Sequence, residues 1–82
     1  MPDQTKSVID RFPDQESWIR RLFETSPNFE TLCREHDETT RALHRLEGGT
    51  AADTAVQLET LRRRRAALDD QLLAMMQQAA RV

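Results

Sequence analysis

The fold is decided by residues 51–80, which read AADTAVQLETLRRRRAALDDQLLAMMQQAA. This stretch contains no proline or glycine, and it is rich in residues that favour helix: alanine, leucine, arginine, glutamine and methionine. One set of positions recurs at alternating steps of four and three residues, which is the heptad spacing of a coiled-coil seam. The set comprises Thr54, Leu58, Leu61, Arg65, Leu68, Leu72, Met75 and Ala79. The stretch therefore predicts one long helix over residues 51–80.

A second seam precedes the first and predicts a helix over residues 27–47. Ser26-Pro27 is a helix-start pair, and Gly48-Gly49 supplies a stop in which one glycine can take a left-handed conformation. The seam residues again alternate steps of three and four: Phe29, Leu32, His36, Thr39, Leu43 and Leu46. Because the connector between the two predicted helices is so short, they must form an antiparallel hairpin.

The short connector also predicts a register for the hairpin. With Leu46 opposite Thr54, the remaining layers pair Leu43 with Leu58, Thr39 with Leu61, His36 with Arg65, Leu32 with Leu68, and Phe29 with Leu72. His36 and Arg65 then form a polar layer, which typically specifies register and orientation at some cost in stability. A slip of half a heptad is the alternative register.

The residues before Ser26 predict a short helix at the open end of the hairpin. Trp18, Ile19, Leu22 and Phe23 form one apolar stripe on a predicted helix over residues 13–24, and residues 1–12 are predicted to be a flexible segment. The predicted third helix is about two turns longer than the second, so this end needs a cover. The expected fold is thus all-α: an antiparallel coiled-coil hairpin with a short N-terminal helix packed near its open end, in one domain over residues 13–82.

Composition excludes several classes of protein. The chain has 82 residues with 12 basic and 14 acidic side chains, and no apolar run approaches the roughly 20 residues of a membrane span. One cysteine cannot form an internal disulfide, and no export leader is recognised, so we expect a cytoplasmic location. Residues 1–47 carry 7 basic and 10 acidic side chains, against 5 and 4 in residues 48–82. This division predicts pairing between the two arms.

The most conspicuous charged motif is the run Arg62-Arg63-Arg64-Arg65. Its functional interpretation is a nucleic-acid contact, because arginine binds phosphate oxygens through a planar fork. Its structural interpretation is ion pairing within the chain. The predicted register places the run opposite residues 35–38, three of which are acidic. Within the third helix, Glu59 lies one turn from Arg63, and Asp69 lies one turn from Arg65. We favour the structural interpretation, because no aromatic side chain that could stack on a base lies beside the run.

No catalytic, cofactor-binding or metal-binding residue is predicted. Cys33, His36 and His44 fall short of the ligand set of a zinc site, and no glycine-rich phosphate loop or Ser/His/Asp arrangement is recognised. The remaining candidate is an apolar surface at the open end, near Leu72 and Leu73, that either completes the core or binds a partner. Its residues are Trp18, Leu22, Phe23, Met75 and Met76.

The two seams resemble those of a known family. The stretch Ser26-Pro27-Asn28-Phe29-Glu30-Thr31-Leu32-Cys33-Arg34-Glu35-His36, together with residues 61–72, is similar to the YdcH-like family of small bacterial helical proteins, which carry a domain of unknown function. Departures occur at Thr39, Thr40, Ala66 and Asp69. The resemblance implies a cytoplasmic helical hairpin without established activity.

The function predicted from the sequence is a protein–protein interaction or scaffold module that acts through a helical face and is not an enzyme. Its partner is an unidentified protein or a second copy of the chain. The alternative is a nucleic-acid-binding accessory protein that uses Arg62, Arg63, Arg64 and Arg65. Salt dependence separates the two, because only nucleic-acid affinity should fall steeply with salt.

Overall fold

The helices follow one another with short connections. The computed structural model describes residues 4–48 and 52–80, and in these residues it contains no strand, which confirms the all-α prediction. Helix α1 (Lys6–Arg11) is followed by a single 3-10 turn, η1 (Pro13–Gln15), and by α2 (Glu16–Thr25). The two long helices are α3 (Pro27–Glu47) and α4 (Ala52–Ala80).

The boundaries of α3 follow from local chemistry. The Ser26 hydroxyl accepts a hydrogen bond from the Phe29 amide at 3.3 Å, and Pro27 occupies the first turn, where its missing N–H costs nothing. At the other end Gly48 has a φ of −86°, so the left-handed cap predicted for one of the glycines is not at Gly48. Gly49 and the expected cap Thr50 lie outside the described residues.

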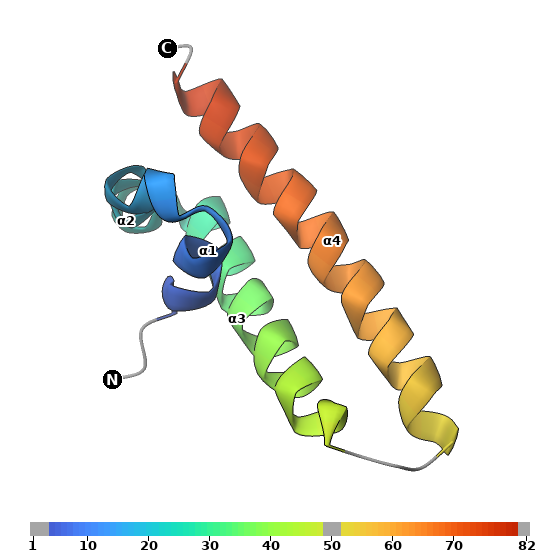
Figure 1. The fold of residues 1–82 in the computed structure, drawn as a ribbon. Helices are drawn as coiled ribbons and strands as arrows, with labels where there is room; N and C mark the ends of the chain where they lie inside the picture. Colours follow the sequence, from blue (N-terminus) through green and yellow to red (C-terminus); the bar gives the residue numbers. More distant parts are fainter. Residues whose placement is uncertain (1–3, 49–51, 81–82) are drawn as a thin grey trace.

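Figure 1 shows how the helices are arranged. Helices α3 and α4 lie side by side and run in opposite directions, while α1 and α2 lie on the side of α3. The C-terminal turns of α4 extend beyond the other helices. Helix α2 contacts α4 near that end, where the Trp18 indole donates to the Met76 carbonyl.

The N-terminal segment differs from the expectation. A flexible segment was predicted over residues 1–12, but this is wrong for residues 6–11, which form α1 with the Val8 side chain fully buried. A helix of six residues is too short to give a periodic pattern in the sequence. An isolated helix of this length is also unstable in water. Contacts with the other helices must stabilise it. Residues 1–3 lie outside the described residues.

The helix predicted over residues 13–24 is divided in two. The 3-10 turn η1 comes first, closed by a hydrogen bond from the Gln15 amide to the Phe12 carbonyl at 3.0 Å, and α2 begins at Glu16. The end of α2 agrees with the prediction to within one residue, since Ser26 has extended dihedral angles. The turn reverses the chain between α1 and α2.

The core lies where all four helices meet. Seven buried side chains form one cluster, with contributions from α1, α2, α3 and α4: Val8, Ile19, Leu22, Phe29, Cys33, Leu72 and Met76. At about 25 cal/mol per Å² of buried apolar surface, such a cluster is the main source of stability. Phe29 and Ile19 are the largest of its members without solvent exposure.

The register between α3 and α4 differs from the predicted one. His36 Nε2 lies 2.6 Å from Asp69 Oδ1, so His36 faces a position four residues beyond Arg65. This is the half-heptad slip, and it keeps apolar residues together, since Phe29 now shares a cluster with Met76. It also gives the buried imidazole a carboxylate partner in place of a guanidinium. The predicted His36–Arg65 layer is therefore wrong.

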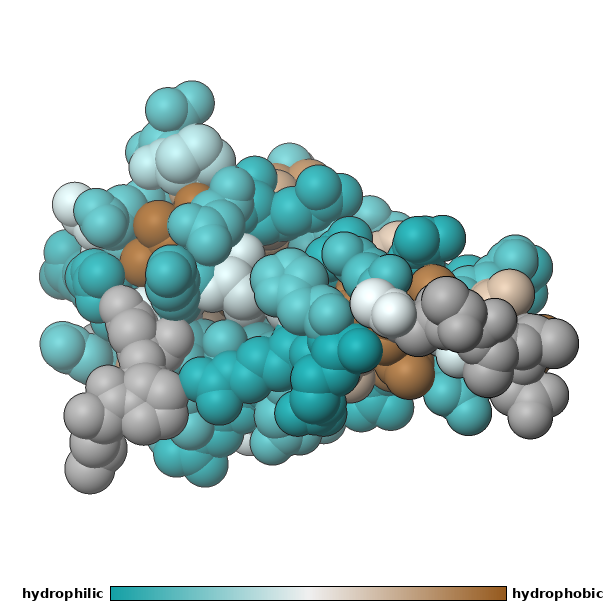
Figure 2. All heavy atoms as spheres, turned by 60° about the horizontal axis from the view of Figure 1, so that its bottom comes forward, coloured by the Kyte–Doolittle hydropathy of each residue, from teal (hydrophilic) through white to brown (hydrophobic). Residues whose placement is uncertain are grey.

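The surface is mainly hydrophilic on the face that Figure 2 shows. Hydrophobic residues form only small separate patches on this face. Across the described ranges, no helix combines the length and the apolar character that a bilayer crossing requires.

Candidate functional site

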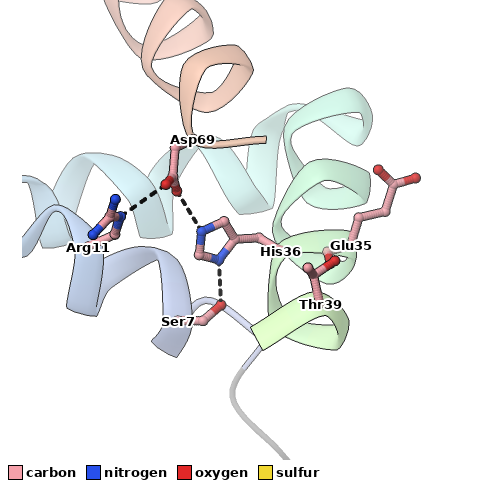
Figure 3. Close-up of polar contacts among 6 residues, drawn as sticks. All are labelled: Ser7, Arg11, Glu35, His36, Thr39 and Asp69. Atoms are coloured by element: carbon pink, nitrogen blue, oxygen red, sulfur yellow. Dashed lines mark hydrogen bonds and ion pairs between the residues drawn. The ribbon is translucent and has the colours of Figure 1, made fainter. Parts of the chain in front are cut away.

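A chain of four polar side chains connects α1, α3 and α4. Ser7 Oγ lies 2.9 Å from His36 Nδ1, and His36 Nε2 lies 2.6 Å from Asp69 Oδ1. Arg11 Nε donates to the other carboxylate oxygen, Oδ2, at 2.9 Å. Figure 3 shows His36 and Arg11 approaching the Asp69 carboxylate from different sides. We call these four residues the His36 network.

The proton positions in the network follow from the donor inventory. An ionised carboxylate can only accept, so we assign the proton to His36 Nε2, and in the neutral ring Nδ1 then accepts from the Ser7 hydroxyl. His36 is 1 % exposed, Asp69 8 % and Ser7 9 %. Every ring nitrogen and both Asp69 oxygens have a partner, as a buried polar cluster requires.

The sequence predicted no Ser/His/Asp arrangement, and the structure corrects this. Ser7, His36 and Asp69 stand in the order of a nucleophile, a base and an orienting carboxylate. Ser7, however, lies nine-tenths buried inside the interface of α1, and Asp69 is shared with Arg11. This geometry suits a structural hydrogen-bond network that attaches α1 to the two long helices. Sequence reasoning missed it because Ser7 lies in the segment that was expected to be flexible.

The arginine run does not pair across the helices. Among the residues that the structure describes, Arg63 alone of the four forms an ion pair, with Glu59 of its own helix at 2.8 Å. The predicted pair within α4 is thus confirmed, and the predicted pairing with residues 35–38 is wrong. Asp37 instead pairs with Arg41 at 3.1 Å, and the Glu35 side chain points away from the His36 network in Figure 3.

Asp69 likewise has other partners than Arg65, because the shifted register turns it toward His36 and Arg11. Arg62 and Arg64 are exposed, and Arg65 is half-buried. The exposed Arg63–Glu59 pair is worth about 0–1 kcal/mol, so the run contributes little to stability. Its guanidinium groups are largely available to solvent.

The predicted partner-binding residues gather where α2 meets the end of α4. Met76 and Leu22 are buried, whereas Trp18, Phe23 and Met75 are half-buried. The Trp18 indole Nε1 donates to the Met76 carbonyl at 3.3 Å, which ties α2 to α4. Part of this predicted surface is therefore core, as the alternative interpretation expected.

Two hollows flank the end of α4. The larger, of about 470 Å³, has an apolar wall formed by Phe12, Pro13, Trp18, Leu73, Met76 and Ala80. We call it the α4 groove. The second, of about 300 Å³, includes Leu22 and Met75. Of the predicted residues, Trp18 and Met76 line the groove, and Leu22 and Met75 line the second hollow.

The polar residues of the α4 groove are Arg11, Asp14, Gln15 and Gln77. The sequence did not single out Phe12 or Arg11, because both lie in the segment expected to be flexible. Leu73 is 41 % exposed and, with Val56, is one of the two exposed large apolar side chains among the described residues. A concave wall with large apolar residues and a few polar ones is typical of a binding site.

Cys33 belongs to the core and not to a reactive site. Burial, with a smaller contribution from the nearby Glu30 carboxylate, raises the pKa of its thiol from 9.0 to about 12. Between these pH values the unfolded chain loses the thiol proton while the folded chain keeps it. Stability should therefore fall as the pH rises from 9 toward 12. Within residues 4–48 and 52–80, no three histidine, cysteine or acidic side chains gather to hold a metal ion.

We expect Cys33 to react with an aromatic disulfide reagent at pH 8 at least about tenfold more slowly than an ordinary thiol, because its raised pKa leaves less of the attacking thiolate and its side chain is buried. Reaction in increasing urea should follow global unfolding. The matched control carries Cys33→Ala with Thr31→Cys, which moves the thiol to an exposed position of the same helix. Equal rates for the two folded proteins would contradict the prediction.

The fold and the site define a small helical protein of a recognisable class: two long helices, a short N-terminal cover and a buried mid-helix histidine. Residues 29–76 match a family model described as a protein of unknown function, DUF465. The chain belongs to this family, the YdcH-like proteins. Neither a curated protein nor a solved structure matches it significantly. The matched residues include His36 and Asp69, but not Ser7 or Arg11.

Proposed function

We propose that the protein is a cytoplasmic protein–protein interaction module without catalytic activity, built on α3 and α4 as an antiparallel coiled-coil hairpin. The α4 groove is its contact surface. The observation that carries this proposal is the concave apolar wall containing Trp18, Leu73 and Met76, in which Leu73 remains 41 % exposed. Burying that surface against a partner would be favourable by about 25 cal/mol per Å².

The exposure of the wall residues supports the same proposal. Leu73 is exposed and Trp18 is half-buried, so a partner can contact both, while Met76 is buried beneath them. The end of α4 also extends beyond the other helices in Figure 1, and the α4 groove lies at this end. Elsewhere α4 exposes one other large apolar residue among those described, Val56, which lines no hollow that we identify.

The test is photo-cross-linking in the native cell, with benzoylphenylalanine at position 73 or, as the matched control, at position 56 of the same helix. We expect one discrete cross-linked species from position 73 and none from position 56. A species of twice the chain mass would identify a second copy as the partner. Equal cross-linking from both positions, or none from either, would overturn the proposal.

A second candidate function is nucleic-acid binding, which the solvent exposure of Arg62 and Arg64 supports. Exposed guanidinium groups without acidic neighbours across the hairpin can release counterions from a phosphate backbone. The four arginines are consecutive residues of one helix, so their side chains point in different directions around it and do not form a single face. This candidate therefore ranks second.

If this second function holds, affinity for a fluorescent single-stranded RNA should fall steeply between about 50 and 200 mM salt. Arg62→Gln with Arg64→Gln should weaken binding at least tenfold. The matched control, Arg20→Gln with Arg21→Gln on α2, should leave binding nearly unchanged. Binding that is insensitive to salt, or equal losses in both double variants, would rule this function out.

A further inference from the structure

Arg11 lies at the boundary between the His36 network and the α4 groove. Its Nε donates inward to Asp69 Oδ2, while the side chain as a whole is 57 % exposed and lines the groove. In the described part of the chain, its two terminal amino groups have no acceptor. One edge of the guanidinium is therefore occupied, and the other is available to a ligand.

The His36 network holds that guanidinium in a defined orientation. Ser7 positions the His36 ring, His36 holds one oxygen of Asp69, and the second oxygen holds Arg11 Nε. Each of the three supporting residues is at least nine-tenths buried. A donor group fixed in advance loses less conformational entropy on binding than a free arginine side chain.

The wall of the groove has the geometry of a helix-packing face. On α4 it presents Leu73, Met76, Gln77 and Ala80, which recur at i, i+3, i+4 and i+7. These positions span about 10 Å, or two helical turns. Side chains at this spacing form the ridges and grooves into which a second helix packs, so a helix suits this face.

We propose that the α4 groove binds an amphipathic helix of a partner protein, whose acidic residue pairs with Arg11 one turn from its apolar anchor residues. This inference rests on the proposed interaction function and names its partner class. Asp69 precedes Leu73 by four residues, so Arg11 marks one end of the apolar wall. The partner's carboxylate meets the free edge of the guanidinium, and its apolar side chains cover Leu73 and Trp18.

Asp14 restricts where the partner's charge can lie. It is the single acidic residue that lines the groove, and it forms no ion pair with Arg11 among the described residues. A carboxylate on the partner is therefore attracted at the Arg11 end and repelled near Asp14. Gln15 and Gln77 are neutral and accept either charge. Complementarity at one end sets the register of the bound helix.

The test uses four synthetic alanine- and glutamine-based helical peptides as probes. Two carry a glutamate one turn from a pair of leucines spaced three residues apart, in the two possible orders, and two carry lysine in place of glutamate. Trp18 is the only tryptophan of the chain and lines the groove, so its fluorescence reports binding directly. Circular dichroism checks that each protein variant is folded.

We expect one glutamate peptide to bind about tenfold more tightly than its lysine counterpart at low salt, since one charge-assisted contact of roughly 1.4 kcal/mol gives that factor. Arg11→Gln should abolish the preference. Asp14→Asn, the matched control on the same rim, should preserve or increase it. Leu73→Glu alters an exposed position outside the His36 network and should abolish binding of the glutamate peptides.

Equal affinity for glutamate and lysine peptides, no binding by any probe, or a preference that persists in Arg11→Gln would overturn this inference. If Arg11→Gln does not fold, the Leu73→Glu and Asp14→Asn variants still decide, because both leave Asp69 and His36 intact. If position 73 cross-links to a partner but the peptides show no preference for glutamate over lysine, the proposed interaction function still holds. Only the inference that the partner is a helix with an acidic residue would then be wrong.

Discussion

Asp69→Ala is expected to lower the free energy of unfolding by about 3 kcal/mol, because it removes the acceptor of two donors at once. His36, 1 % exposed, would lose its partner at Nε2, and Arg11 would lose its anchor. Breaking a buried polar pair typically costs about 3–5 kcal/mol, and partial exposure of Arg11 reduces that figure. For a chain of this length, total stability is about 4–12 kcal/mol, so the loss is large. Urea unfolding followed by circular dichroism measures it.

Asp70→Ala is the matched control for that prediction, since Asp70 is the next residue of α4 and is exposed. We expect it to change stability by less than about 0.5 kcal/mol. A double-mutant cycle then tests the register itself. His36→Ala and Asp69→Ala should show a coupling energy above about 1 kcal/mol, whereas His36→Ala and Arg65→Ala should show almost none. The reverse result would favour the register predicted from the sequence.

Val8→Asp is expected to destabilise the protein by about 3 kcal/mol or more, because it places an unpaired carboxylate in the core. The Val8 side chain is fully buried in the cluster that contains Phe29 and Leu72. Burying a charge without a partner is among the few changes with so large an effect. The same urea titration measures the loss. The protein should also bind less of any partner at the α4 groove, because Arg11 and Phe12, which line the groove, lie three and four residues after Val8.

The matched control is Lys6→Asp, which makes the same side chain at an exposed position of α1 two residues earlier. We expect it to alter stability by less than about 0.5 kcal/mol, since a carboxylate is favourable near a helix N-terminus. Equal, small effects of the two substitutions would mean that α1 does not dock on the long helices. The segment before Phe12 would then be flexible, as the sequence pattern alone predicted.

Much of the fold was predictable because its signals are local. Ser26-Pro27 marked the start of α3, the heptad steps predicted two long helices, and the absence of proline and glycine predicted the length of α4. The family resemblance rested on the same residues and is confirmed by the match over residues 29–76. Helix propensity, capping and periodicity depend on neighbours in the chain, so a reading of the sequence reaches them.

The candidate site was predictable only in part. Trp18 and Met76 were identified from their apolar character near the open end, and both line the α4 groove. Arg11 was missed, because it is the last residue of a six-residue helix, and so short a helix is stable only through its contacts with the rest of the fold. Asp69 was interpreted as a neighbour of Arg65, and no local feature shows that it faces His36.

The composition and heptad spacing of residues 51–80 were enough to predict a long helix, and α4 forms over Ala52–Ala80. Which turn of α4 faces which turn of α3 was not predictable from these local patterns. Two registers half a heptad apart bury similar apolar residues, so the hydrophobic pattern hardly distinguishes them. The choice depends on Ser7 and Arg11, which lie far away in the chain and complete the hydrogen bonds of His36 and Asp69 only when Asp69 is in place.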